Sequence, residues 1–154
     1  MKLSLLLVIV IAFSLSVMAQ QSKENEFYLI VGTYTNDQKT NGIHVYTFNA
    51  QSADFQEKSK FTDITNPSFL AISKDKKNVY AVSEGGQGKG VNAFSFDMKT
   101  GKLTLMKSGS AGGNGPCYIS VDDKKQWVFA GNYGGGSLSA TKLTSEGSLS
   151  ETTQ

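Results

Sequence analysis

Five polar residues stand directly after apolar segments of the chain, at positions where loops commonly present catalytic and binding groups. Glu84 follows the apolar segment 78–83 and opens the glycine-rich loop 85–90. A carboxylate at such a loop can act as a general base that takes a proton from water, so we predict Glu84 as a catalytic residue. Two other apolar segments end in hydroxyl and amide groups that can bind a polar substrate; these predicted substrate-binding residues are Thr33, Tyr34, Asn132 and Tyr133. In the alternative interpretation, all five only cap and space strands.

Other residues with reactive or metal-binding groups are too scattered to form a site. The one histidine, His44, and the one cysteine, Cys117, both lie within apolar segments, which favours structural roles. We predict no metal site, because metal centres need several ligands close together. Lys89 is followed by Gly rather than the Ser or Thr of a P-loop. The glycines of that loop are more typical of a strand connection than of a phosphate site, and we predict no cofactor.

The candidate residues belong to a sequence pattern that repeats. Residues 67–84 align without a gap with residues 116–133, and the segment 42–48 aligns with 90–96. Short segments rich in Val, Ile, Tyr and Phe, separated by Gly, Asn, Asp and Lys, predict β-strands. After the N-terminal segment, no part of the chain has the 3.6-residue apolar period of a helix.

Four short strands repeated every 40 to 50 residues or so are typical of β-propeller blades. We therefore predict an all-β fold of antiparallel, four-stranded blades at roughly 27–61, 64–108 and 114–152. Equivalent strand ends of successive blades face one another around the channel, so the five site residues would share one channel mouth. Because a closed ring takes at least four blades, we expect the chain to be part of a longer propeller. The alternative is a short piece that oligomerises into a ring.

The N-terminus has the features of a secretory signal peptide. Lys2 precedes an apolar run from Leu3 to Phe13, and small residues stand before Gln20. The alternative is a membrane anchor, although the run is shorter than the roughly 20 residues that span a bilayer. We predict that residues 1–19 are cleaved, leaving an incomplete propeller domain at 20–154 that is periplasmic or secreted and not attached to a membrane.

The charge balance argues against a nucleic-acid partner. The chain has 15 basic residues, all of them lysine, and 13 acidic ones. It therefore lacks the concentrated basic surface that binds phosphate backbones. It also lacks arginine, whose planar group best holds a carboxylate or phosphate by two hydrogen bonds.

The chain resembles the propeller-type lactonase family, which includes 6-phosphogluconolactonases and muconate-lactonising enzymes. Four segments occur in the family's order and spacing: Val-Gly-Thr-Tyr-Thr at 31–35, the strand beginning at Gly42, Asn-Pro-Ser-Phe-Leu-Ala at 66–71, and Gly-Asn-Tyr-Gly-Gly-Gly-Ser at 131–137. The resemblance implies a seven-bladed propeller, with this chain as about its first third. The family's histidine-rich and arginine-containing segments fall in later blades.

The resemblance also implies a function, hydrolysis of a sugar lactone in carbohydrate metabolism. Attack of water on the lactone carbonyl needs a general base and donors for the developing oxyanion, and Glu84 is the candidate base. A phosphorylated sugar intermediate belongs in the cytoplasm, so the predicted export favours an unphosphorylated lactone. The alternative is a non-catalytic secreted propeller that binds a glycan or a protein.

Overall fold

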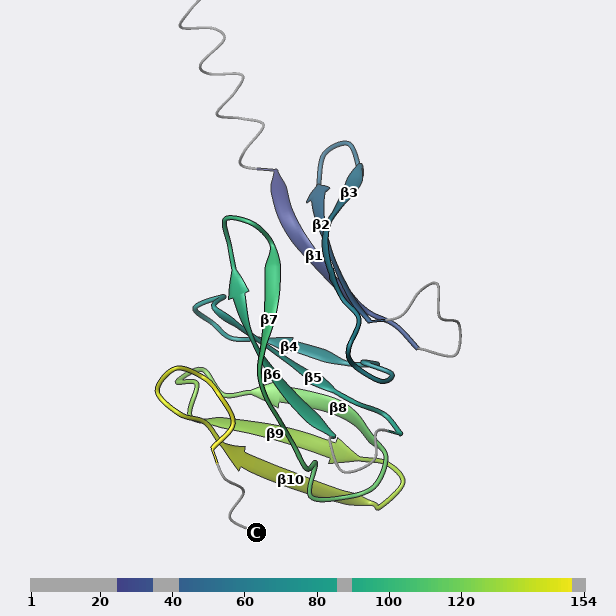
Figure 1. Cartoon of the computed structure of the whole chain (residues 1–154), viewed down its shortest axis with the longest axis vertical. Helices are drawn as coiled ribbons and strands as arrows, with labels where there is room; N and C mark the ends of the chain where they lie inside the picture. The colour runs from purple at the N-terminus through teal and green to yellow at the C-terminus, as the bar shows by residue number, and fades with distance from the viewer. Residues whose placement is uncertain (1–24, 35–41, 86–89, 151–154) are drawn as a thin grey trace, which may run out of the picture.

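The computed structural model describes residues 25–34, 42–85 and 90–150, which form three antiparallel sheets (Figure 1). The predicted signal peptide lies outside these residues. The described residues contain no helix, which confirms the predicted all-β antiparallel fold, and none of them forms a helix able to cross a membrane. The strands are β1 (Glu26–Gly32), β2 (Ile43–Asn49), β3 (Phe55–Phe61), β4 (Leu70–Ile72), β5 (Asn78–Val82), β6 (Val91–Asp97), β7 (Lys102–Gly109), β8 (Pro116–Val121), β9 (Trp127–Asn132) and β10 (Ser137–Lys142).

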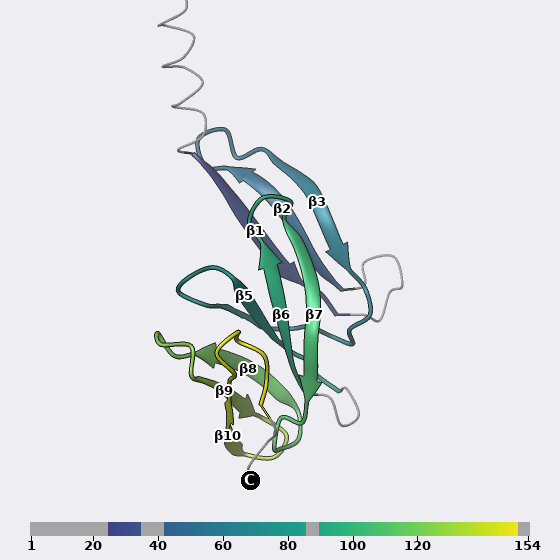
Figure 2. The same cartoon turned by 60° about the vertical axis from the view of Figure 1, so that its left-hand side comes forward.

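Each sheet is built from strands that are consecutive in the sequence. Sheet 1 has the order β1-β2-β3, sheet 2 the order β4-β5-β6-β7, and sheet 3 the order β8-β9-β10. Four-stranded blades were predicted, but sheet 3 has three strands among the described residues, and Leu149 forms only an isolated bridge to Leu143. The three sheets follow one another side by side in chain order, as the two views agree (Figures 1 and 2).

The core lies between neighbouring sheets, and β5 divides it into two apolar clusters. Every residue of this strand is buried, although successive side chains of a strand point to opposite faces. Val79 and Ala81 join the apolar cluster on the side of sheet 1, whereas Tyr80 and Val82 join the cluster on the side of sheet 3. Sheet 2 is therefore covered on both faces, which a single blade cannot achieve alone.

Two tyrosine hydroxyls bind turns of the neighbouring sheet. The Tyr28 hydroxyl of sheet 1 donates to the carbonyl of Met98 in sheet 2, at 3.2 Å. The Tyr80 hydroxyl of sheet 2 donates in the same way to Gly147 beyond sheet 3, at 2.9 Å. A side chain at Gly147 would come within 2.6 Å of Asn78, and its φ is +87°, so this turn requires glycine. The tyrosines thus anchor the outer turn of the next sheet.

Two ion pairs join the turns at the strand ends opposite Glu84. Lys74 lies 2.9 Å from Asp123, and Lys125 lies 3.0 Å from Asp75. The Ser73 hydroxyl, together with Lys125 and a backbone N–H, holds the pKa of Asp75 at about 2 against the desolvation that opposes this shift. The ordinary value is 3.8. The charged form of Asp75 is therefore favoured in the folded protein.

This shift predicts part of the acid sensitivity of the fold. Because the pKa of Asp75 is lower in the folded state, its stabilisation is complete above about pH 4 and is lost as the pH falls through about 2. We expect the Asp75→Asn variant to show a shallower loss of unfolding free energy over this pH range in denaturant titrations. Asp123→Asn is the control, because its side chain is 80% exposed and such pairs contribute little. Equal slopes for Asp75→Asn and the unmodified protein would contradict the assignment.

Candidate active site

The side chains of Tyr34 and Glu84 meet at one end of the first two sheets. Tyr34 follows β1 and Glu84 follows β5, and these strands hold equivalent places beside β2 and β6. The Tyr34 hydroxyl donates a hydrogen bond to the Oε2 atom of Glu84 at 2.7 Å. This bond is the main cause that raises the pKa of Tyr34 above 10.0, with desolvation and the charge of Glu84 acting in the same direction. The phenol therefore remains a hydrogen-bond donor at neutral pH.

The backbone of Glu84 is held by Asn66, in the loop before β4. The Asn66 side-chain amide donates to the Glu84 carbonyl at 3.0 Å, and the Glu84 N–H donates to the Asn66 carbonyl at 3.1 Å. Asn66 has a φ of +41°, a left-handed conformation that Asn adopts more readily than most residues. Two hydrogen bonds to one residue thus fix the point from which the carboxylate projects.

Gly32 allows β1 to approach this same loop. A methyl group built on Gly32 would overlap the carbonyl oxygen of Pro67. The strand can pack against the loop only because glycine has no side chain. This close approach brings Tyr34, two residues further on, across the boundary between sheets to Glu84.

The other predicted substrate-binding residues are placed differently. The Thr33 hydroxyl donates to a backbone carbonyl at the base of its own hairpin, at 3.0 Å. Asn132 is 2% exposed, and its amide donates to the Ala111 carbonyl of the loop before β8, at 3.1 Å, and to the Ser137 hydroxyl of β10, at 3.3 Å. Tyr133 is 88% exposed. The described contacts therefore bring together Tyr34 and Glu84, while the other three stand near the ends of their strands.

An aromatic pair was missed by the sequence analysis. The rings of Phe69 and Tyr118 lie 4.8 Å apart, and the two residues are 41% and 50% exposed. They come from the start of β4 and from β8, which are adjacent strands of sheets 2 and 3. The repeat could have predicted this pair, because the two aromatics occupy the same position of the aligned segments 67–84 and 116–133.

The histidine and the cysteine have structural surroundings. His44 is 8% exposed, lies 3.3 Å from a Glu57 oxygen and stacks on Tyr46. Cys117 is half-buried and contacts the carbonyl of Gly131 at 3.8 Å. Within residues 25–34, 42–85 and 90–150, no three potential ligands gather in a group that could hold a metal ion.

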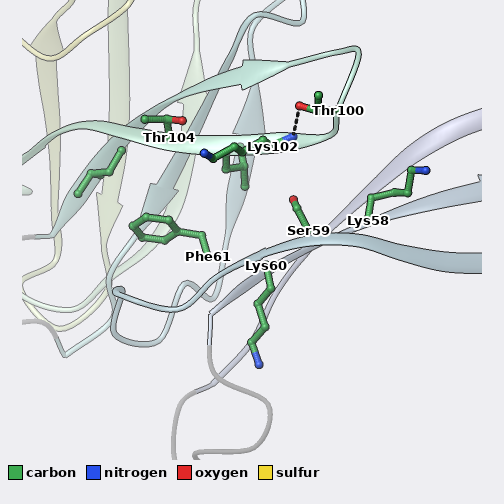
Figure 3. Close-up of a pocket in the computed structure, with 9 residues that line it drawn as sticks. Lys58, Ser59, Lys60, Phe61, Thr100, Lys102 and Thr104 are labelled. Atoms are coloured by element: carbon green, nitrogen blue, oxygen red, sulfur yellow. Dashed lines mark hydrogen bonds between the residues drawn. The ribbon is translucent and has the colours of Figure 1, made fainter.

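A groove of about 540 Å³ lies between the outer strands β3 and β7 (Figure 3). Figure 3 shows Phe61 between these strands and Lys60 pointing away from β7. None of the predicted site residues lines this groove. Its lysines, Lys58, Lys60 and Lys102, stand on strands at sheet edges, where lysine discourages pairing with other chains. We assign the groove no part in the site.

Comparison with known proteins places this geometry in a family. Residues 28–154 match the model of the family described as lactonase, 7-bladed beta-propeller. The 6-phosphogluconolactonase of Bacillus subtilis is 32% identical over 120 residues, which are 77% of this chain and 34% of that protein. This chain thus spans about a third of the length of the curated relatives it matches.

Two solved structures agree with this match. A candidate 6-phosphogluconolactonase from Bacteroides fragilis superposes with a TM-score of 0.77 and 32% identity, over 83% of this chain and 35% of that one. The periplasmic gluconolactonase of Pseudomonas aeruginosa gives a TM-score of 0.72 and 27% identity, over 81% and 37%. These findings confirm the resemblance stated from the sequence. With three successive antiparallel sheets and a match from residue 28 onward, the chain belongs to the seven-bladed β-propeller lactonase family.

Proposed function

We propose that the protein carrying this chain hydrolyses a sugar lactone, with Glu84 as its general base. The observation that carries the proposal is the 2.7 Å hydrogen bond between Tyr34 and Glu84, formed across two blades at their shared end. A carboxylate held in this way, in a member of a lactonase family, has the chemistry needed to activate water. The names of the relatives, 6-phosphogluconolactonase and gluconolactonase, support this substrate class.

In the proposed reaction, Glu84 takes a proton from water as the oxygen of that water bonds to the lactone carbonyl carbon. The ring C–O bond then breaks, and the proton passes to the departing ring oxygen, which yields a hydroxy acid. Because Tyr34 occupies Oε2 of Glu84, the proposed atom that takes the proton is Oε1. Asn66 prevents the carboxylate from moving away.

The remaining site residues receive different parts in this proposal. Tyr133 is the proposed direct substrate contact, because its side chain is 88% exposed. Thr33 and Asn132 hydrogen-bond to nearby backbone groups, which supports a role in positioning the strand ends from which Tyr34 and Tyr133 project.

We further propose that blades outside this chain close the ring and complete the channel mouth. Sheet 1 has three strands, whereas sheet 2 has four, and β1 leaves one edge unpaired among the described residues. Phe27, Leu29 and Val31 of β1 are 56%, 43% and 36% exposed. A groove of about 800 Å³ lies between β1 and the sheet 2 residues around Ile72. An additional inner strand would pair with the free edge of β1, and a further blade packed on the face of sheet 1 that points away from sheet 2 would cover these apolar side chains.

The proposed compartment is the periplasm or the extracellular space, and the proposed substrate is an unphosphorylated lactone. The predicted signal peptide at 1–19 and the periplasmic location named for the Pseudomonas relative support both proposals. Mass determination of the purified mature protein would show a first residue of Gln20 if the signal is cleaved. A mature protein that still starts at Met1 would contradict export by this route.

The test of function is hydrolysis by the complete propeller of D-glucono-1,5-lactone and of its 6-phosphate, followed by acid release at constant pH. We expect a rate above spontaneous ring opening for at least one of them, with preference for the unphosphorylated lactone. A preference for the phosphate would overturn the substrate assignment. Spontaneous rates for both, and for a panel of other aldonolactones, would reject the lactonase function.

A further inference from the structure

We infer that Phe69 and Tyr118 form an aromatic wall of the substrate site, against which the ring of the lactone stacks. This inference rests on the proposed lactonase function and adds two substrate contacts to Tyr133, the contact proposed above. The aromatic wall is defined here as these two side chains only.

The wall is built at equivalent places of two successive blades. Phe69 and Tyr118 occupy the same position of the aligned repeats, and their rings lie 4.8 Å apart at an angle of 46°. Both stay largely exposed, at 41% and 50%, while the residues one repeat position further on pack inward, as buried Ile119 shows. Large aromatic side chains are usually buried between sheets, so two exposed ones at the inner strands form a surface suited to a ligand.

The wall adjoins the Tyr34–Glu84 pair. The Phe69 carbonyl accepts a hydrogen bond from Val82, two residues before Glu84, at 3.1 Å. Asn66, three residues before Phe69, binds the backbone of Glu84 through both its side-chain amide and its carbonyl, at 3.0 and 3.1 Å.

Tyr118 connects the wall to the third blade. Its backbone pairs with Gly131, the residue before Asn132. The aromatic wall therefore lies between the end of β5, which carries Glu84, and the end of β9, which carries the exposed Tyr133.

The chemistry of this surface matches a sugar lactone. One face of a sugar ring presents C–H groups, which pack well on aromatic rings, while its hydroxyls need polar partners at the edge. A ring stacked on the wall would hold its carbonyl close to the Glu84 carboxylate. The ligand class is therefore a cyclic sugar derivative.

The experiment compares Tyr118→Leu and Phe69→Leu with Tyr118→Phe in the complete propeller. We expect each Leu variant to raise KM for D-glucono-1,5-lactone roughly tenfold, equivalent to about 1.4 kcal/mol of binding. The value of kcat should stay within about twofold, because stacking stabilises substrate and transition state alike. Tyr118→Phe retains the ring and should keep the original KM. Phe55→Leu is the matched control, since Phe55 is 68% exposed on the outer strand β3.

A binding measurement separates this inference from the lactonase proposal. D-glucono-1,5-lactam, a stable analogue of the ring, is titrated calorimetrically into the unmodified, Tyr118→Leu and Phe55→Leu proteins. If no lactone is hydrolysed but Tyr118→Leu weakens lactam binding about tenfold, the aromatic wall is supported as a binding surface and the catalytic proposal fails. If lactone is hydrolysed and both Leu variants keep KM and lactam affinity within twofold, the wall is wrong. Absence of lactam binding by the unmodified protein also overturns it.

Discussion

Replacement of Glu84 by Gln in the complete propeller is expected to reduce kcat for lactone hydrolysis by roughly 10²- to 10⁴-fold. Gln has the same shape, and its carbonyl oxygen can still accept the hydrogen bond from Tyr34, which is 2.7 Å long in the native pair. It cannot take a proton from water at neutral pH. We therefore expect KM to change little, because the lost interaction belongs to the transition state. Steady-state kinetics with D-glucono-1,5-lactone measures both values.

Glu146→Gln provides the matched control for this prediction. Glu146 is exposed, and its only described hydrogen bond uses its backbone carbonyl, which accepts from Asn78. The control should retain the native kcat within about twofold. A Glu84→Gln protein with native turnover would remove Glu84 from the role of base. A variant whose KM alone rises would instead make Glu84 a binding residue.

Replacement of Gly32 by Ala is expected to cause the largest loss of stability, about 3 kcal/mol, the upper end for steric overpacking. The added methyl group would overlap the carbonyl oxygen of Pro67. A backbone atom cannot move aside as a flexible side chain can, so β1 or the loop must shift. The shift would separate Tyr34 from Glu84 and lower turnover as well. Denaturant unfolding and the lactone assay measure the two effects.

Gly131→Ala is the control for the stability prediction. Gly131 also lies in a strand, but an added methyl group would meet the Cβ of Tyr118 at 3.5 Å, an ordinary contact. We expect its unfolding free energy to remain within about 1 kcal/mol of the native value. A Gly32→Ala protein as stable as Gly131→Ala would show that the close approach of β1 to the loop is not required.

Local sequence patterns were sufficient to predict the strands and their equivalence between blades. Alternating apolar residues and a gapless repeat locate β4, β5, β8 and β9, because these features depend on neighbours along the chain. Tyr34 and Glu84 were predicted at equivalent strand ends because each directly follows an apolar segment. Their hydrogen bond agrees with that placement, since equivalent ends of successive blades are near one another.

Contacts between loops and sheets could not be predicted in the same way. The side chain of Asn132 turns inward, where its amide reaches the Ala111 carbonyl of the loop before β8 and the Ser137 hydroxyl of its own sheet. Its placement therefore depends on the path of that loop. Asn66 fixes Glu84 through a left-handed backbone conformation that no periodic pattern encodes. The aromatic wall had a signal in the repeat, but its exposure follows from the packing of sheets 2 and 3.

The most direct test of the proposed catalytic centre is a double-mutant cycle on kcat for lactone hydrolysis, using Tyr34→Phe, Glu84→Gln and the double variant. If the Tyr34 hydroxyl acts by orienting the Glu84 carboxylate, its removal should slow the native enzyme about tenfold but have almost no effect once Glu84 is Gln. The double variant would then match Glu84→Gln alone. Losses that multiply, or a native protein no faster than spontaneous hydrolysis, would contradict the account.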